Sequence, residues 1–311
     1  MGEKLNFLIL GNSHSAELFA EGLISTGCSC VAAVSLAKDF LPDNSEGLKS
    51  WSEKSSISYR EIRSVNDIEF NEIVESAEPD LLIVNWPRII NESTLDLFRL
   101  GAIGSHPSQL PWGSGRHPLQ WQIAMGIRNS CLSFFRLTPE VDEGPLLLQI
   151  PYEITSDDTI LTVLSKIDQA TFSGARELGL KLIKNQLEPL ALPVGTKVPI
   201  WRRRNLADVE IDCRMSTNAI IRLVNSFIPP YPGAKLLTEF GSVTITGASK
   251  HDFKSWDLYQ IGSVLKTGTN SIVLRADDGP VELKCRDQLP ENFCKLQFVH
   301  PPSFYSTKEI N

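Results

Sequence analysis

The sequence predicts an α/β protein with a doubly wound, mostly parallel sheet, followed by a smaller β-rich region. Two continuous apolar runs, Leu5–Leu10 and Leu81–Val84, have the pattern of strands buried on both faces. A helical pattern follows each run, and this repeated strand, loop and helix order favours parallel strands joined by right-handed crossovers. Towards the C-terminus, glycines at 241, 262, 268 and 279 separate short apolar segments. These segments indicate a small open β-barrel or sandwich.

The chain length is sufficient for more than one domain. With 311 residues it can bury one substantial core and a smaller second one. We expect a catalytic domain at residues 1–190, a proline-punctuated linker at 191–205, and a helix with a β-barrel-like domain at 206–311. The residues after Pro301 are predicted to be a tail.

The first elements form a β-α-β unit. Leu5–Leu10 is followed by Gly11, and Ser13 is in position to cap a helix that begins beside it. Val31–Val34 is the second strand. A dinucleotide fingerprint needs three glycines where only Gly11 occurs, so we exclude an NAD site. The helix N-terminus is interpreted either as a capped helix end or as a site for an anion such as a sugar-linked phosphate.

The next elements complete the predicted sheet. Residues 40–60 are polar and are expected to be a surface excursion around a short helix, and Val65–Ser76 is a predicted helix. Leu81–Val84 is followed by a helix at 92–99, which leads to a strand that starts at Ala102 and ends at Gly104. We expect both buried runs to lie beside this central strand.

The segment from Gly101 to Gln149 is the most informative part of the chain. A loop rich in glycine, serine and proline begins at His106, and such a loop is costly to order unless it binds something. A short helix after Pro118 and a strand at Cys131–Leu137 come next. A turn that contains Asp142 then leads to a strand at Leu146–Ile150. His106 and Asp142 are therefore expected to meet at one edge of the sheet.

The remaining elements are a long amphipathic helix at Thr159–Lys184 and, after the linker, a helix at Asn218–Phe227. The net charge of −7 argues against broad nucleic-acid binding. No apolar stretch approaches the ~18 residues of a membrane span, and no signal peptide is evident. The six cysteines match no metal-ligand spacing, so we expect reduced cysteines, no metal and a cytoplasmic protein.

Several motifs resemble those of the formyltetrahydrofolate-dependent formyltransferase family. They are His106-Pro-Ser-Gln-Leu-Pro111, Asp142-Glu-Gly-Pro-Leu-Leu-Leu-Gln149, Trp201–Asp212, Pro229–Ala234 and Gly262–Leu283. The last three are similar to the C-terminal region of the sugar and tRNA enzymes of the family. The resemblance implies a formyltransferase-like fold and N10-formyltetrahydrofolate as cosubstrate. It also implies formyl transfer to a nucleotide-linked amino sugar, with a homodimer as an open possibility.

The resemblance also assigns roles to residues. His106 matches the family's general acid/base and Asp142 the carboxylate that holds its ring, which suits a residue that accepts and returns a proton near neutral pH. The two segments implied in folate binding are Trp86, Pro87, Arg88, Ile89 and Ile90, and Val141, Asp142, Glu143 and Gly144. The residues implied in substrate binding are Ser105, Trp112, Gly115, His117, Arg202, Arg203 and Arg204.

One position departs from the family pattern. An asparagine that donates a hydrogen bond to the oxyanion usually stands two residues before the histidine, and here that residue is Gly104. Losing such a donor typically lowers the rate ~10²–10³-fold. Asn85, Ser105 and His117 are candidate replacements, and Asn85 is favoured because the missing side chain of Gly104 is expected to leave room for it.

The alternatives follow from these same features. Methionyl-tRNA formyltransferases usually have an arginine-rich loop after the histidine motif, whereas Trp112–Arg116 contains one arginine. Glycinamide ribonucleotide formyltransferases generally lack the C-terminal β-region. Gly104 keeps open a catalytically silent protein that binds folate or a nucleotide sugar.

Overall fold

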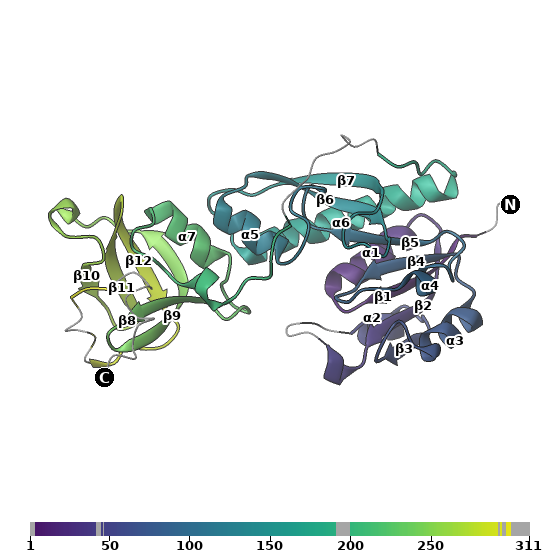
Figure 1. The fold of residues 1–311 in the computed structure, drawn as a ribbon, viewed down its shortest axis with the longest axis horizontal. Coiled ribbons are helices and arrows are strands. Elements are labelled where there is room, and N and C mark those ends of the chain that lie inside the picture. The colour runs from purple at the N-terminus through teal and green to yellow at the C-terminus, as the bar shows by residue number, and fades with distance from the viewer. Residues whose placement is uncertain are drawn as a thin grey trace. The chain divides into compact units, whose positions relative to one another are not determined.

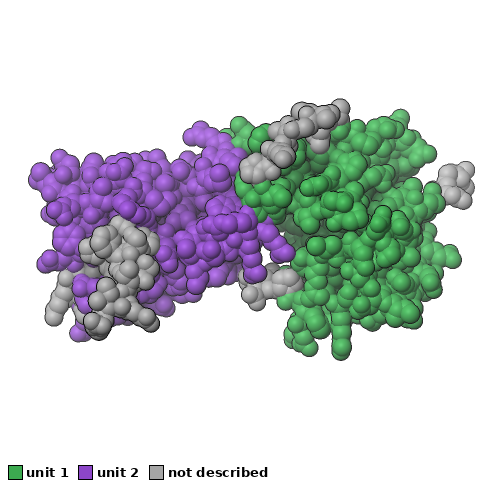
Figure 2. Space-filling view, viewed as in Figure 1, with its two compact units in different colours: residues 1–115, 129–153, 164–201 green, residues 116–128, 154–163, 202–311 purple. Residues whose placement is uncertain are grey.

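The computed structural model describes residues 4–41, 45, 47–190, 200–291, 293 and 297–299. The chain forms two compact units, coloured separately in Figure 2. Unit 1 comprises residues 1–115, 129–153 and 164–201, and unit 2 comprises 116–128, 154–163 and 202–311. Unit 2 thus includes two segments that the sequence interpretation assigned to the first domain. The predicted linker residues 191–199 and the predicted tail lie outside the described residues.

Unit 1 is built on a seven-stranded sheet of order β3-β2-β1-β4-β5-β6-β7 (Figure 1). The strands are β1 Asn6–Gly11, β2 Ser29–Leu36, β3 Tyr59–Ile62, β4 Leu81–Asn85, β5 Ala102–His106, β6 Asn129–Arg136 and β7 Leu146–Glu153. The first five are parallel, and β6 and β7 are antiparallel to their neighbours. The predicted doubly wound, mostly parallel sheet is confirmed.

Helices cover both faces of this sheet, as the fully buried strands require. The helices are α1 His14–Ile24, α2 Lys49–Lys54, α3 Ile68–Ala77, α4 Glu92–Leu95 and α6 Ile160–Ile183, with a 3₁₀ turn at Lys38–Phe40. On one face Leu8 and Leu10 share a core with Phe70 of α3. On the other face the Phe19 ring of α1 meets Phe134 edge-on at 5.2 Å. The small residue Gly22 allows α1 to approach α6, since a Cβ there would lie 2.6 Å from the Ala175 Cβ.

Five details predicted for unit 1 differ from the structure. Strand β3 was missed, because its Tyr-Arg-Glu-Ile sequence is polar and pairs only along the sheet edge with β2. Strand β5 continues to His106, and its only parallel neighbour is β4, so the run containing β1 lies one strand away. Helix α4 ends at Leu95 rather than at residue 99. Ser13 does occupy the N-cap of α1, but its side chain makes no capping hydrogen bond.

Unit 2 contains a five-stranded antiparallel sheet of order β10-β11-β12-β9-β8 (Figure 1). Its strands are β8 Ala234–Thr238, β9 Gly241–Lys250, β10 Val264–Thr267, β11 Ser271–Ala276 and β12 Gly279–Cys285. Its helices are α5 Pro118–Met125 and α7 Thr217–Asn225, with 3₁₀ turns at Leu206–Val209 and Trp256–Leu258. Helix α7 packs Ile220, Leu223 and Val224 into a core with the sheet.

Other sequence expectations concern cysteines, metals and membranes. Five cysteines in the described residues are free thiols, namely Cys28, Cys30, Cys131, Cys213 and Cys285, and Cys294 lies outside the described residues. Within that described part of the chain, no three His, Cys, Asp or Glu side chains form a group suited to a metal ion. None of the helices placed there has the length and apolarity needed to cross a membrane.

Candidate active site

His106 ends β5 with its side chain largely buried, and both ring nitrogens face protein oxygens. Nε2 lies 3.0 Å from the Gly113 carbonyl oxygen, and Nδ1 lies 3.7 Å from Oδ1 of Asp142. A carbonyl can only accept a hydrogen bond, so Nε2 carries the proton and donates it to Gly113. In the neutral ring Nδ1 is then the nitrogen that can accept a proton, beside a carboxylate that would stabilise the resulting charge. The structure therefore brings the predicted pair together.

The loop between His106 and α5 is held from two directions. The His106 ring binds the Gly113 carbonyl, and Oδ2 of Asp142 accepts a hydrogen bond of 2.9 Å from the Gly115 amide. Gly113 and Gly115 have φ of +75° and +104°, which side-chain-bearing residues rarely adopt. A Cβ on Gly115 would also lie 2.3 Å from the Trp201 carbonyl oxygen. The glycines of this loop thus allow both contacts with the pair.

Polar side chains from β6 and β7, which the sequence interpretation missed, anchor the same loop. His106 pairs with Ser133 on β6, and Ser133 pairs with Gln149 on β7, so the three lie in one row across the sheet. The Ser133 hydroxyl donates to the Ser108 carbonyl at 2.6 Å, and Gln149 Nε2 donates to the Leu110 carbonyl at 3.0 Å. The available signal was a serine and a glutamine that interrupt apolar stretches, Leu132–Phe135 in β6 and Leu146–Ile150 in β7.

The space beside Gly104 is filled rather than open. A Cβ on Gly104 would lie 2.7 Å from Cδ1 of Leu137, so Leu137 occupies the direction that an asparagine side chain would take. The expectation of free room at this position was wrong, because Leu137 follows β6 directly and its amide bonds to the Ala102 carbonyl beside it.

Asn85 ends β4, the strand next to β5, and its amide group has a defined orientation. The Ser13 hydroxyl donates to Oδ1 of Asn85 at 2.9 Å. This contact also explains why Ser13 does not cap α1 through its side chain. With the amide oxygen turned to Ser13, Nδ2 is left as a hydrogen-bond donor at the carboxyl edge of the sheet.

The segment after β4 contains a donor without an acceptor and an arginine that already has protein partners. The buried indole Nε1 of Trp86 has no acceptor among the described residues, so it is a donor available to a ligand. Arg88 instead donates to the Arg63 carbonyl at 3.0 Å and lies over the Phe40 ring. Pro87 and Ile89 are exposed, and Ile90 is buried in the core.

The turn that contains Asp142 combines exposed and tightly packed residues. Val141 and Glu143 are exposed, whereas Gly144 is buried. A Cβ on Gly144 would lie 1.7 Å from the Arg136 carbonyl oxygen, so only glycine fits. Asp142 itself has φ of +58°, a left-handed conformation that aspartate tolerates better than most residues.

The predicted substrate residues fall in both units. Ser105 is half-buried on β5, and Trp112 is exposed on the loop. In unit 2, Arg202 binds Asp208 at 2.6 Å, and buried Arg204 donates to the Ser226 hydroxyl and the Asp208 carbonyl. Arg202 and Arg203 are both exposed, whereas Arg204 is buried. Two of the three arginines therefore stabilise unit 2.

His117 precedes α5 with φ of +57°, and its Nδ1 lies 3.4 Å from the Arg204 amide. Partial burial, and then the positive charges of Arg203, Arg204 and Arg116, lower the pKa of His117. The ring is therefore neutral at pH 7, so it offers hydrogen bonds rather than a charge to a ligand.

Replacing Asp142 with asparagine is expected to lower turnover about 10–100-fold, which corresponds to the free energy of one charge-assisted contact. The asparagine oxygen can still accept from the Gly115 amide, so the loop keeps its anchor while His106 loses its anionic neighbour. Steady-state kinetics together with a thermal melt would separate the two effects. Glu140→Gln is the matched control, because Glu140 is an exposed acid in the same segment. Equal turnover of Asp142→Asn and Glu140→Gln would contradict a role for the carboxylate.

The chain matches a family model described as formyl transferase over residues 4–175. A bifunctional polymyxin resistance protein ArnA from Wigglesworthia glossinidia brevipalpis is 25% identical over 195 residues. The match covers 62% of this chain and 30% of that protein, so the chain spans less than a third of its relative.

Solved structures with low sequence identity share the fold. WlaRD, a sugar 3N-formyltransferase crystallised in the presence of dTDP and 5-N-formyl-THF, is 14% identical with a TM-score of 0.67. The alignment covers 93% of this chain and all of that one. HypX from Aquifex aeolicus, in complex with tetrahydrofolic acid, is 14% identical with a TM-score of 0.63, and 94% of this chain aligns with 47% of HypX.

Proposed function

Because the chain belongs to the formyl transferase family, we propose that it transfers a formyl group from N10-formyltetrahydrofolate to the amine of a nucleotide-linked deoxyamino sugar. The observation that carries this proposal is the His106–Asp142 pair at the carboxyl end of β5, with its loop held by both members. The sugar 3N-formyltransferase aligns over its whole length with 93% of this chain, and this similarity supports a sugar as the acceptor.

The proposed reaction begins as the sugar amine attacks the formyl carbon. Nδ1 of His106 accepts the proton that the amine loses, and the carboxylate of Asp142 stabilises the charged ring. The resulting tetrahedral oxyanion needs a hydrogen-bond donor, for which Nδ2 of Asn85 is the proposed group. The carbon–N10 bond then breaks, and His106 returns the proton to N10. The products are a formamide on the sugar and tetrahydrofolate.

Folate is proposed to bind between residues 86–90 and 141–144. The unpaired Trp86 indole N–H suits this role. A buried donor without an acceptor carries a free-energy penalty, and a bound ligand that provides an acceptor would remove it. Arg88 is less suited than the sequence suggested, since its guanidinium already binds a carbonyl. Residues 1–190 are proposed as the catalytic domain, with 206–311 as a C-terminal domain.

Assays with N10-formyltetrahydrofolate and a panel of dTDP-linked 3-amino sugars test the proposal. We expect turnover on at least one sugar and none on methionyl-tRNA. Formylation of methionyl-tRNA instead would overturn the acceptor class but keep the family chemistry.

A second candidate is a catalytically silent folate-binding protein, and Leu137 in place of the usual amide favours it. Calorimetry with folinic acid distinguishes the two. Binding without turnover on any acceptor in the panel would support the silent protein, whereas binding with turnover would exclude it.

A further inference from the structure

Unit 2 contains a pocket of about 880 Å³ that neither the sequence interpretation nor the proposed reaction uses. Its walls come from four segments, at residues 123–128, 154–159, 218–225 and 248–250. All four belong to unit 2, and none includes His106, Asp142 or another residue proposed for catalysis. The pocket is therefore a separate candidate binding site.

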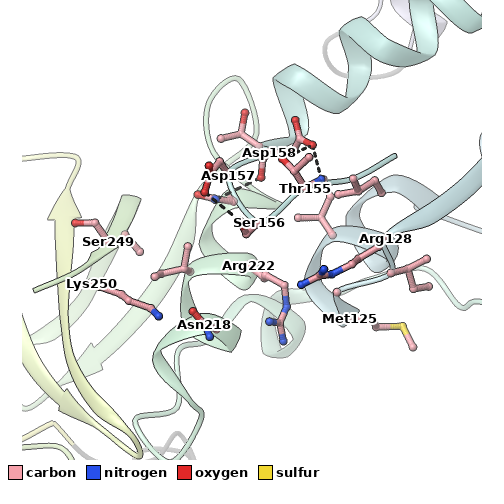
Figure 3. Close-up of a pocket in the computed structure, with 18 residues that line it drawn as sticks. Met125, Arg128, Thr155, Ser156, Asp157, Asp158, Asn218, Arg222, Ser249 and Lys250 are labelled. Carbon is pink, nitrogen blue, oxygen red and sulfur yellow. Dashed lines mark hydrogen bonds between the residues drawn. The ribbon is translucent and has the colours of Figure 1, made fainter. Parts of the chain in front are cut away.

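Three cationic side chains line this pocket. Arg128, Arg222 and Lys250 extend their nitrogen-bearing ends on the side away from the loop that carries Asp157 and Asp158 (Figure 3). Among the described residues, none of the three cations lies within ion-pair distance of a carboxylate. In a chain with 37 acidic and 30 basic side chains, three cations in one pocket with no carboxylate in ion-pair contact point to an anionic ligand. Besides the hydrogen bond from the Thr217 amide, the charge of Lys250 helps to lower the pKa of Asp278, but Lys250 and Asp278 form no ion pair.

The acidic residues of the pocket do not neutralise these cations. Oδ2 of Asp158 accepts from the Thr155 amide at 2.6 Å, and Oδ1 accepts from the Thr162 hydroxyl at 2.7 Å, so this carboxylate holds the start of α6. Asp157 accepts from its neighbour Ser156 at 3.2 Å. Both carboxylates thus accept hydrogen bonds from their own loop or from the first turn of α6.

Arg222 is held in place by the backbone. Its Nε donates to the Ala124 carbonyl at 3.4 Å, and its two terminal nitrogens form no hydrogen bond with the described residues. Gly126, with φ of +73°, allows this approach, because a Cβ there would lie 3.0 Å from Nε of Arg222. A guanidinium positioned in this way suits bidentate binding of a phosphate.

The remaining lining is mixed, because Thr155, Ser156, Thr159, Asn218, Asn225 and Ser249 contribute polar side chains beside an apolar part. The apolar part consists of Ile123, Met125, Ile127, Ile154, Ile221 and Ala248. Pockets that bind small molecules typically combine such a surface with a few polar groups that fix orientation. We propose that this pocket binds a small molecule that joins a diphosphate to an apolar or planar group, the chemistry of a nucleoside diphosphate. Arg128, Arg222 and Lys250 bind the phosphates, and the isoleucines contact the remainder.

Met125 provides a direct reporter for this site. The chain has three methionines, Met1, Met125 and Met215, and only Met125 lines the pocket. The test is an NMR titration of the full chain, labelled with ¹³C at the methionine methyl groups, with pyrophosphate and with ADP in parallel. The Met125 signal is expected to shift saturably with both, while Met215, packed against the core of unit 2, stays in place. ADP is expected to bind at least about tenfold more tightly than pyrophosphate, because only ADP also contacts the apolar wall.

Charge reversal tests the cations. The double variant Arg128→Glu, Lys250→Glu is expected to weaken binding at least about tenfold, since two exposed charge-assisted contacts are lost. Both residues are exposed, so folding is expected to survive, and folinic acid binding is the check. Lys266→Glu changes an exposed lysine of β10 outside the pocket and should bind as the parent does.

Four results would overturn the proposal. The first is the absence of a Met125 shift up to about 10 mM of either probe, a concentration well above ordinary dissociation constants. The second is an equal shift in the double variant and the parent. The third is an equal affinity for pyrophosphate and ADP. Tighter binding of a single-stranded RNA oligomer than of ADP would also overturn it, in favour of an RNA phosphate site. The proposal is independent of the formyl acceptor, because the reporter does not require turnover.

Discussion

Replacing His106 with glutamine is expected to lower formyl transfer by about 10²–10⁴-fold, the usual contribution of a positioned general acid/base. Glutamine can still donate to the Gly113 carbonyl, as Nε2 of His106 does at 3.0 Å, but it cannot accept a proton near neutral pH. The variant therefore removes the chemistry while keeping the contact that holds the loop.

The measurement is kcat with saturating formyl donor and amino sugar, combined with a thermal melt and folinic acid affinity. His106→Ala should lose the same turnover and also some stability, since the buried Gly113 carbonyl loses its donor at a cost of about 1–3 kcal/mol. His251→Gln is the control, because it removes a histidine from unit 2. Near-normal turnover of His106→Gln would show that another group moves the proton.

The sheet was largely predictable because its strands are buried on both faces. Such strands are continuous apolar runs, and β1, β2 and β4 were all recognised in this way. Strand β3 gave no such signal, since it lies at the edge and is stabilised by pairing with β2. The neighbours of β5 also depend on long-range pairing, which an apolar pattern does not encode.

The candidate site was predictable where local sequence determines it. The turn-forming residues around His106 and Asp142 predicted that both lie at one edge of the sheet. In the structure His106 Nδ1 lies 3.7 Å from Asp142 Oδ1. What occupies the space beside Gly104 was not predictable, because Leu137 approaches it from a strand that is distant in sequence. The protein partners of Arg88, Arg202 and Arg204 were not predictable for the same reason, since they are carbonyls and a carboxylate brought near only by the folded chain.

Replacing Asn85 with alanine is expected to lower turnover by about 10²–10³-fold, the effect typical of one lost oxyanion donor. The Ser13 hydroxyl binds Oδ1 of Asn85 at 2.9 Å and so turns Nδ2 away from itself. Because the oxyanion exists only beyond the ground state, kcat should fall while the affinity for folate changes little. Asn85→Asp should be at least as harmful, since it replaces a donor with a negative charge beside the developing oxyanion.

Ser13→Ala distinguishes a positioned amide from a merely polar one. This variant keeps the Asn85 donor but removes the bond that orients it, so turnover should fall less than in Asn85→Ala. The double variant Ser13→Ala, Asn85→Ala should be no worse than Asn85→Ala alone, since Ser13 acts through Asn85. Additive losses would mean that Ser13 has a separate role.

The double variant Gly104→Asn, Leu137→Ala tests the opposite hypothesis, in which the chain is silent because its usual donor is absent. Leu137→Ala removes the Cδ1 atom that a Cβ at Gly104 would meet at 2.7 Å, so the new amide has room. If Asn85 already supplies the donor, this variant should have nearly the same turnover as the parent. Replacing Asn85 in this variant should then lower turnover by far less than about 10²-fold, because a second donor now binds the oxyanion. If the parent is inactive and the variant turns over, the chain lost its catalysis at Gly104 and Asn85 is not the donor.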